Sequence, residues 1–124
     1  MDYRERSHES FILSTLQEGD LMGELGDKQE KFTYCIGKLI VWAFEHGYRL
    51  RFGDTYPGKS KHSPFGRHPL GLAVDLHLFI DGDYQKTTEA HKPLGEYYES
   101  LDPKATWGGR WEDGNHYSWD ETKR

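Results

Sequence analysis

Two histidines and one aspartate carry the side-chain types of a hydrolytic metal centre. His68 lies seven residues before Asp75, so a tight connection could bring an imidazole and a carboxylate to one point. Both groups are good zinc ligands, and a catalytic zinc site usually combines three protein ligands with one open position for water. His116, in a later aromatic segment, could supply the third ligand. Together these residues could hold one zinc ion, which would lower the pKa of water and polarise a carbonyl group. Taken singly each is a weak signal, because backbone hydrogen bonds can also satisfy a histidine before a proline or an aspartate in a strand.

A further carboxylate, Asp113, lies three residues before His116 across a turn that contains Gly114. At this spacing the carboxylate could take a proton from the attacking water without binding the metal, which is the role of a general base. Asp-Gly-Asn is also an ordinary turn sequence, in which a carboxylate caps backbone groups or faces solvent. Spacing alone leaves both interpretations open.

The clearest strand of the sequence holds one of the candidate ligands. Residues 72–80 alternate so that Ala73, Asp75, His77 and Phe79 share one face, and Val74, Leu76, Leu78 and Ile80 share the other. A carboxylate within so apolar a strand is costly to bury without a partner or a metal, which makes Asp75 the most informative candidate. We expect the aliphatic face to pack on a helix and the other face to line a pocket. His77 could support a ligand, contact a substrate or simply line that pocket.

Apolar periodicity and turn residues predict the elements around this strand. Helical spacing predicts a short helix over 8–18, a main helix from Asp27 to Gly47 and a third helix between Pro93 and Pro103. Asp27 and Glu30 resemble a capping box at the start of the main helix. The single cysteine, Cys35, falls on that helix and is expected in the core.

Shorter elements complete the expected fold. Alternation predicts a strand over 48–52, followed by a loop to Arg67 that is long enough to be functional. Residues 81–83 predict a hairpin turn, 107–111 a sharp bend, and 113–119 a turn that leads into an aromatic strand. Helices against an antiparallel sheet make an α+β domain.

Size and charge exclude several other classes. The 124 residues suit one domain over 1–124, and the formal net charge of −5 leaves no basic surplus for nucleic acid or anionic lipid. The first residues lack the apolar core of a secretion signal, and no run approaches the roughly 18 apolar residues of a membrane span. We therefore expect a monomer that is made in the cytoplasm and binds neither nucleic acid nor membrane.

Two motifs carry a specific resemblance to a known family. His-Pro-Leu-Gly-Leu-Ala-Val-Asp at 68–75 resembles the H-x-x-G-x-A-x-D motif of a family of zinc peptidases. Trp-Gly-Gly-Arg-Trp at 107–111, followed by Asp-Gly-Asn-His-Tyr at 113–117, is similar to the W-G-G…D/E-x-x-H element of the same family. The family includes VanY-type D-alanyl-D-alanine carboxypeptidases and phage L-alanyl-D-glutamate endolysins. With the helix and strand before them, the motifs cover about three-quarters of the chain.

The resemblance implies a hedgehog-like fold and a catalytic metal site. Carried over by position, it makes His68, Asp75 and His116 the ligands of one Zn²⁺ per chain and Asp113 the catalytic acid/base. The implied activity is that of a metallopeptidase that hydrolyses an amide bond in the peptide stem of bacterial peptidoglycan. L-Ala–D-Glu endopeptidase and D-Ala-D-Ala carboxypeptidase activities both remain open. The small size and the lack of a separate wall-binding module resemble a bacteriophage or prophage endolysin that reaches the cell wall through a holin lesion.

The sequence departs from the family at two positions. Gly66 stands where members commonly have Ser, and Pro57 follows Gly-Asp-Thr-Tyr where many members have Arg. Several residues could contact substrate in place of that Arg or beside it, namely Arg51, Lys59, Lys61, Arg67, His77 and Trp107. Core packing is the commoner fate of a tryptophan, and we expect it for at least two of Trp107, Trp111 and Trp119. The alternative function is an inactive zinc-binding module of the cell wall or the virion that keeps the fold.

Overall fold

The main helix, α2 (Gly23–Glu45), is terminated by Gly47 just after its last turn. The computed structural model describes residues 23–53, 67 and 70–123, so the predicted helix over 8–18 lies outside the described residues. Gly47 has a φ of 89°, its N–H bonds to the carbonyl of Phe44, and the N–H of Tyr48 bonds to that of Ala43. This pair of bonds is a Schellman motif, which satisfies the last carbonyls of a helix. The sequence therefore located the end of the main helix correctly.

The start of α2 differs from the prediction. The helix begins at Gly23, so Asp27 lies in its second turn and the predicted capping box is wrong. The one large apolar side chain of the first turn, Leu25, is exposed, so no buried periodicity marks this turn in the sequence. Contacts with distant segments hold the second turn: Gln29 Nε2 donates to the carbonyl of Leu70 at 2.8 Å, and Lys28 Nζ lies 3.3 Å from Asp120 Oδ2.

Five antiparallel strands form the sheet. They are β1 (Arg49–Phe52), β2 (Ala73–Ile80), β3 (Asp83–Gln85), β4 (Ala105–Trp107) and β5 (His116–Trp119). The order is β1-β2-β5-β4, and β3 pairs with β2 beyond the end of β5. Asp81 and Gly82 both have positive φ and make the two-residue β2–β3 hairpin turn, as predicted. Strand β4 was not predicted, because Trp107 was assigned to a bend and the two residues before it to no element.

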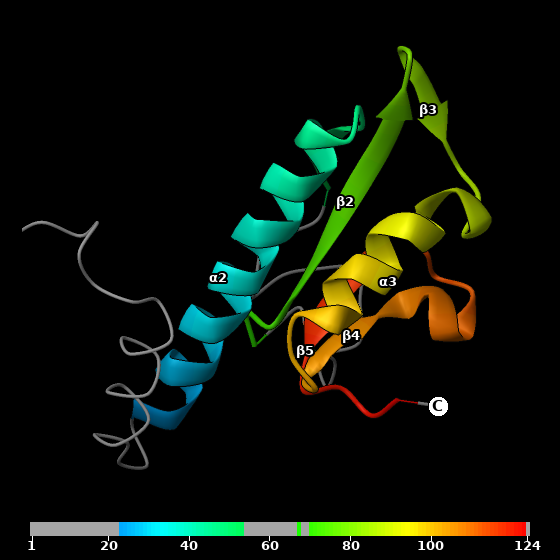
Figure 1. Ribbon diagram of the computed structural model, residues 1–124. Helices are drawn as coiled ribbons and strands as arrows, with labels where there is room; N and C mark the ends of the chain where they lie inside the picture. The colour runs from blue at the N-terminus through cyan, green and yellow to red at the C-terminus, as the bar shows by residue number, and fades with distance from the viewer. Residues whose placement is uncertain (1–22, 54–66, 68–69, 124) are drawn as a thin grey trace, which may run out of the picture.

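The core lies between one face of this sheet and two helices. Val74, Leu76 and Leu78 of β2 are buried against α2 and α3 (Lys92–Ser100), which contributes Leu94 and Tyr98. Figure 1 shows α2 along β2 and α3 over the end of the sheet that holds β4 and β5. Helices on one face of an antiparallel sheet confirm the α+β class. Cys35 and Trp119 are buried in the same core, as expected.

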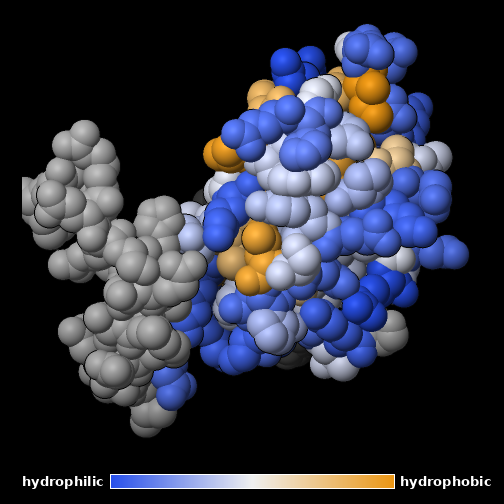
Figure 2. All heavy atoms as spheres, in the orientation of Figure 1, coloured by the Kyte–Doolittle hydropathy of each residue, from blue (hydrophilic) through white to orange (hydrophobic). Residues whose placement is uncertain are grey.

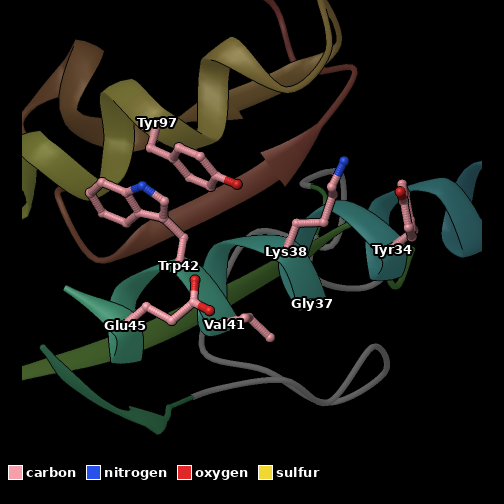
Figure 3. A pocket seen from close by; sticks show the side chains of 7 residues that line it. All are labelled: Tyr34, Gly37, Lys38, Val41, Trp42, Glu45 and Tyr97. Carbon is pink, nitrogen blue, oxygen red and sulfur yellow. The ribbon is translucent and has the colours of Figure 1, made fainter. Parts of the chain in front are cut away.

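A stack of aromatic rings fixes the two helices to each other. The indole of Trp42 on α2 lies parallel to the ring of Tyr97 on α3, with centroids 4.5 Å apart, and also stacks with the ring of His46 at 4.2 Å. Figure 3 shows this stack at one end of a shallow groove along α2. The visible face of the molecule is mainly hydrophilic, with small separate hydrophobic patches (Figure 2). Within the described part of the chain, neither helix is long and apolar enough to cross a membrane.

Candidate metal centre

Strands β2 and β5 bring two of the predicted ligands together. Asp75 and His116 are direct partners in the antiparallel register, so their side chains project from the same face of the sheet. His116 Nδ1 lies 3.8 Å from Asp75 Oδ1, and the two side chains are 8% and 13% exposed. Two donors on one tetrahedral zinc ion, with bonds of about 2.0–2.1 Å, lie about 3.3 Å apart. The pair therefore needs only a small adjustment to share a metal ion.

The other ring nitrogen of His116 has a different partner. Nε2 lies 2.9 Å from Oε1 of Glu121, and the hydroxyl of Ser118 donates to the same oxygen at 2.6 Å. Asp75 and Glu121 thus stand at opposite nitrogens of one imidazole. Sequence reasoning missed Glu121, because no family motif includes it and its approach depends on a chain reversal after β5. A carboxylate five residues after a proposed histidine ligand was the only available signal.

The surroundings of His116 favour a positive charge. Burial alone would lower the pKa of the imidazole, but the contacts with Asp75 and Glu121 and the charge of Asp113 raise it to about 9. Burial likewise opposes the ionisation of Glu121, yet hydrogen bonds with His116 and Ser118 hold its pKa below the usual range. Three carboxylates around one buried imidazole therefore make a place where a positive charge is stabilised.

The turn before β5 holds Asp113 near His116. The N–H of His116 bonds to the carbonyl of Asp113 at 3.1 Å, and the N–H of Asp113 bonds to the carbonyl of Gly108 at 2.9 Å. A Cβ on Gly108 would lie 2.7 Å from His116 Cβ and even closer to the carbonyl of Asp113. A side chain at position 108 would therefore force this turn away from β5. This close contact explains why the first glycine of the Trp-Gly-Gly element cannot carry a side chain.

Trp107 supports the same turn from the opposite face of the sheet. It pairs with Tyr117, the neighbour of His116 in β5, so its side chain projects toward α3. The indole packs against Gly95 and Gly109, and its N–H donates to the carbonyl of Gly114 at 2.7 Å. The structure does not bring Trp107 to the face of Asp75, where a substrate contact was expected. The ring near that face is Trp111, whose centroid lies 5.7 Å from that of His116.

Two candidate contacts, His77 and Arg51, lie on the hairpin side of the Asp75–His116 pair. His77 is next along the same face of β2, 3.2 Å from the hydroxyl of Tyr84, and its ring lies over Gly53. Arg51 of β1 pairs with His77, and its guanidinium lies over the ring of Phe79 at 4.0 Å. The structure therefore places Arg51 and His77 together on the sheet, toward the β2–β3 hairpin.

Arg67 and His68 precede β2. The guanidinium of Arg67 donates to the carbonyl of Asp120, and its charge also acts on Glu121. His68 lies outside the described residues, as do Lys59 and Lys61. Among the residues that the structure describes, no three His, Cys, Asp or Glu side chains form a group that could hold a metal ion. The zinc ion and its three ligands therefore stay a prediction from the sequence.

Comparison with known proteins adds no family assignment: no protein-family model matches the chain, and no curated protein matches it significantly.

Proposed function

We propose that the protein is a zinc peptidase that hydrolyses an amide bond in the peptide stem of bacterial peptidoglycan. The observation that supports this best is the pairing of Asp75 with His116 on one face of the sheet, at 3.8 Å. The two residues belong to the two separate motifs on which the family resemblance depends. A chance likeness of two short motifs would not require their predicted ligands to meet across neighbouring strands.

The donor set fits zinc. One imidazole nitrogen and one carboxylate oxygen, both mostly buried, face each other, and His68 would complete a set of two histidines and one carboxylate. Bound there, zinc would supply a Lewis acid for the scissile carbonyl and make water acidic enough to react near neutral pH. Two neutral imidazoles and one carboxylate leave the ion with a net positive charge for this purpose.

The chain itself would handle the proton. Asp113 is held by the turn that begins at Gly108, near enough for its charge to act on His116. Its carboxylate would accept a proton from the attacking water and then donate it to the leaving amine nitrogen, as one general acid/base does in both steps. Arg51 and His77, farther along the same face of the sheet, would contact the carbonyl or carboxylate groups of the stem. We place the enzyme, on the family resemblance, among phage or prophage endolysins.

Cleavage assays with defined substrates test this function. Purified protein, loaded with zinc or treated with a chelator, is incubated with peptidoglycan and with a peptide that ends in D-Ala-D-Ala. Mass spectrometry then identifies new termini. We expect cleavage by the zinc-loaded protein alone, and the position of the new terminus identifies it as an endopeptidase or a carboxypeptidase.

Ligand variants and a matched control separate metal loss from unfolding. Asp75→Ala and His116→Ala should lose zinc and activity, whereas Asp83→Ala, an exposed carboxylate at the start of β3, should retain both. If zinc-loaded protein cleaves neither substrate, the result would contradict the proposed peptidase activity and favour the alternative of an inactive zinc-binding module. Full zinc occupancy in His116→Ala would remove the proposed metal site.

A further inference from the structure

The segment after β5 turns back toward the sheet and carries an acidic side chain to the candidate site. Asp120 has a φ of 60°, its N–H bonds to the carbonyl of Lys104 at 2.7 Å, and its own carbonyl accepts a hydrogen bond from Arg67. The hydroxyl of Thr106 lies 3.3 Å from the carbonyl of Glu121. Contacts with Arg67 and with the segment around β4 therefore fix the backbone position of Glu121.

The carboxylate of Glu121 is fixed at its other end as well. Its Oε1 accepts a hydrogen bond from Ser118 Oγ at 2.6 Å and lies 2.9 Å from His116 Nε2. The side chain is only 22% exposed, and that of His116 is 8% exposed. A carboxylate held by a strand hydroxyl and by its own backbone is a rigid acceptor for an imidazole N–H.

A neutral imidazole carries one N–H and one lone pair, on different nitrogens. Carboxylates face both nitrogens of His116, and the closer one, Glu121, holds the proton on Nε2. When a metal ion replaces the proton on Nδ1, the ring keeps its N–H at Nε2 and binds the ion through Nδ1, the nitrogen that faces Asp75. Histidines that bind metal ions usually donate their second N–H to such a carboxylate, which fixes the tautomer and makes the imidazole a better ligand. The orientation of His116 toward Asp75 thus depends on the group at its opposite nitrogen.

We propose that Glu121 is a positioning residue that holds His116 in the tautomer and orientation in which Nδ1 can bind a metal ion beside Asp75. This inference rests on the proposed zinc site. Ser118 takes part by holding the carboxylate, and neither residue needs to contact the ion or the substrate. The pair extends the site beyond the motif residues to the segment that follows β5.

The test compares zinc affinity in Glu121→Ala, Glu121→Gln and Ser118→Ala with that of the parent and of Glu96→Gln, an exposed position on α3. Competition with a chromophoric chelator gives each dissociation constant. Loss of a carboxylate that supports a histidine ligand usually weakens metal binding by about 10- to 100-fold. We expect that loss in Glu121→Ala, a smaller one in Glu121→Gln and Ser118→Ala, and parent affinity in Glu96→Gln.

A second readout separates positioning from general stability. Long-range proton–nitrogen NMR spectra of the zinc-loaded parent should show the proton of His116 on Nε2, and that proton should exchange with water faster in Glu121→Ala. Parent affinity and parent exchange in Glu121→Ala would overturn the role of Glu121 while the zinc site stands. A parent protein that binds no zinc would overturn the site and this inference together. If Glu121→Ala fails to fold, the milder Glu121→Gln decides between the same outcomes.

Discussion

Gly37 lies on α2 and Gly95 on α3, and the surroundings of these two glycines predict opposite effects of the same substitution. Gly37 is exposed on α2, and a Cβ added there would have no atom within 4 Å. Gly95 is buried on α3, and an added Cβ would lie far inside 3.0 Å of three ring atoms of Trp107. Both residues are interior helix positions, so Gly→Ala gives each the same helix propensity gain of about 1 kcal/mol.

At Gly95 the gain in helix propensity is outweighed by the steric overlap between the added Cβ and the ring of Trp107. Forcing an extra carbon into a packed site costs up to about 3 kcal/mol, and a displaced Trp107 would lose its hydrogen bond to Gly114, worth about 1 kcal/mol. Gly95→Ala should therefore destabilise the protein by about 3 kcal/mol, whereas Gly37→Ala should stabilise it by about 1 kcal/mol. With a urea m-value of about 1.5 kcal/mol/M, the midpoints move by about −2 M and +0.7 M.

Equilibrium urea unfolding of the two variants, followed by circular dichroism, measures both shifts. A second comparison locates the overlap: in a Trp107→Leu background the indole is gone, so Gly95→Ala should cost much less than in the parent. An unfolding midpoint for Gly95→Ala at or above that of the parent would show that α3 and β4 do not approach as closely as described. An equal cost in both backgrounds would remove Trp107 as the cause.

Three further predictions concern the site and its surroundings. Asp113→Asn should lower hydrolysis by about 100-fold or more at unchanged zinc content, because an amide cannot accept the proton; turnover near that of the parent would leave Asp113 a turn residue. His77→Ala should retain its zinc, since His77 contacts Tyr84 and lies over Gly53; a large loss on metal analysis would make it a ligand. Burial, aided by the charge of His77, lowers the pKa of His91 from 6.5 to about 4. On acidification this histidine is therefore protonated in the unfolded chain before it is protonated in the folded protein, so stability falls as the pH drops from 6.5 toward 4. From pH 7 to pH 5, the free energy of unfolding measured in urea should fall by about 2 kcal/mol more in the parent than in His91→Gln. An equal fall in the two proteins would contradict a buried neutral His91.

The sequence predicted those elements correctly whose residue pattern is compatible with a single local structure. Alternation in β2 assigned each residue to a face, and the aliphatic face packs in the core, so Asp75 was correctly separated from Val74 and Leu76. The end of α2 followed from Gly47, because a positive φ there suits glycine. These features depend on neighbours in the sequence, which a pattern can report.

Features that depend on distant contacts were missed. The second turn of α2 is held by Leu70 and Asp120, neither of which leaves a trace in the helix sequence. Strand β4 is too short to show alternation, and without it the face of Trp107 could not be assigned. Glu121 reaches His116 only because the chain reverses at Asp120, a non-glycine residue in the left-handed region that no local pattern indicates.

The pairing of β2 with β5 also has a consequence for the order in which the protein folds. The β2–β3 hairpin closes over a two-residue turn and can form within microseconds, whereas β2 and β5 come from distant parts of the chain and must close a long loop. Asp75 and His116 meet only in that slower step. An ion bound between them would therefore stabilise this slower pairing. The free energy of unfolding would rise with the logarithm of the ion concentration, and the two strands would separate more slowly.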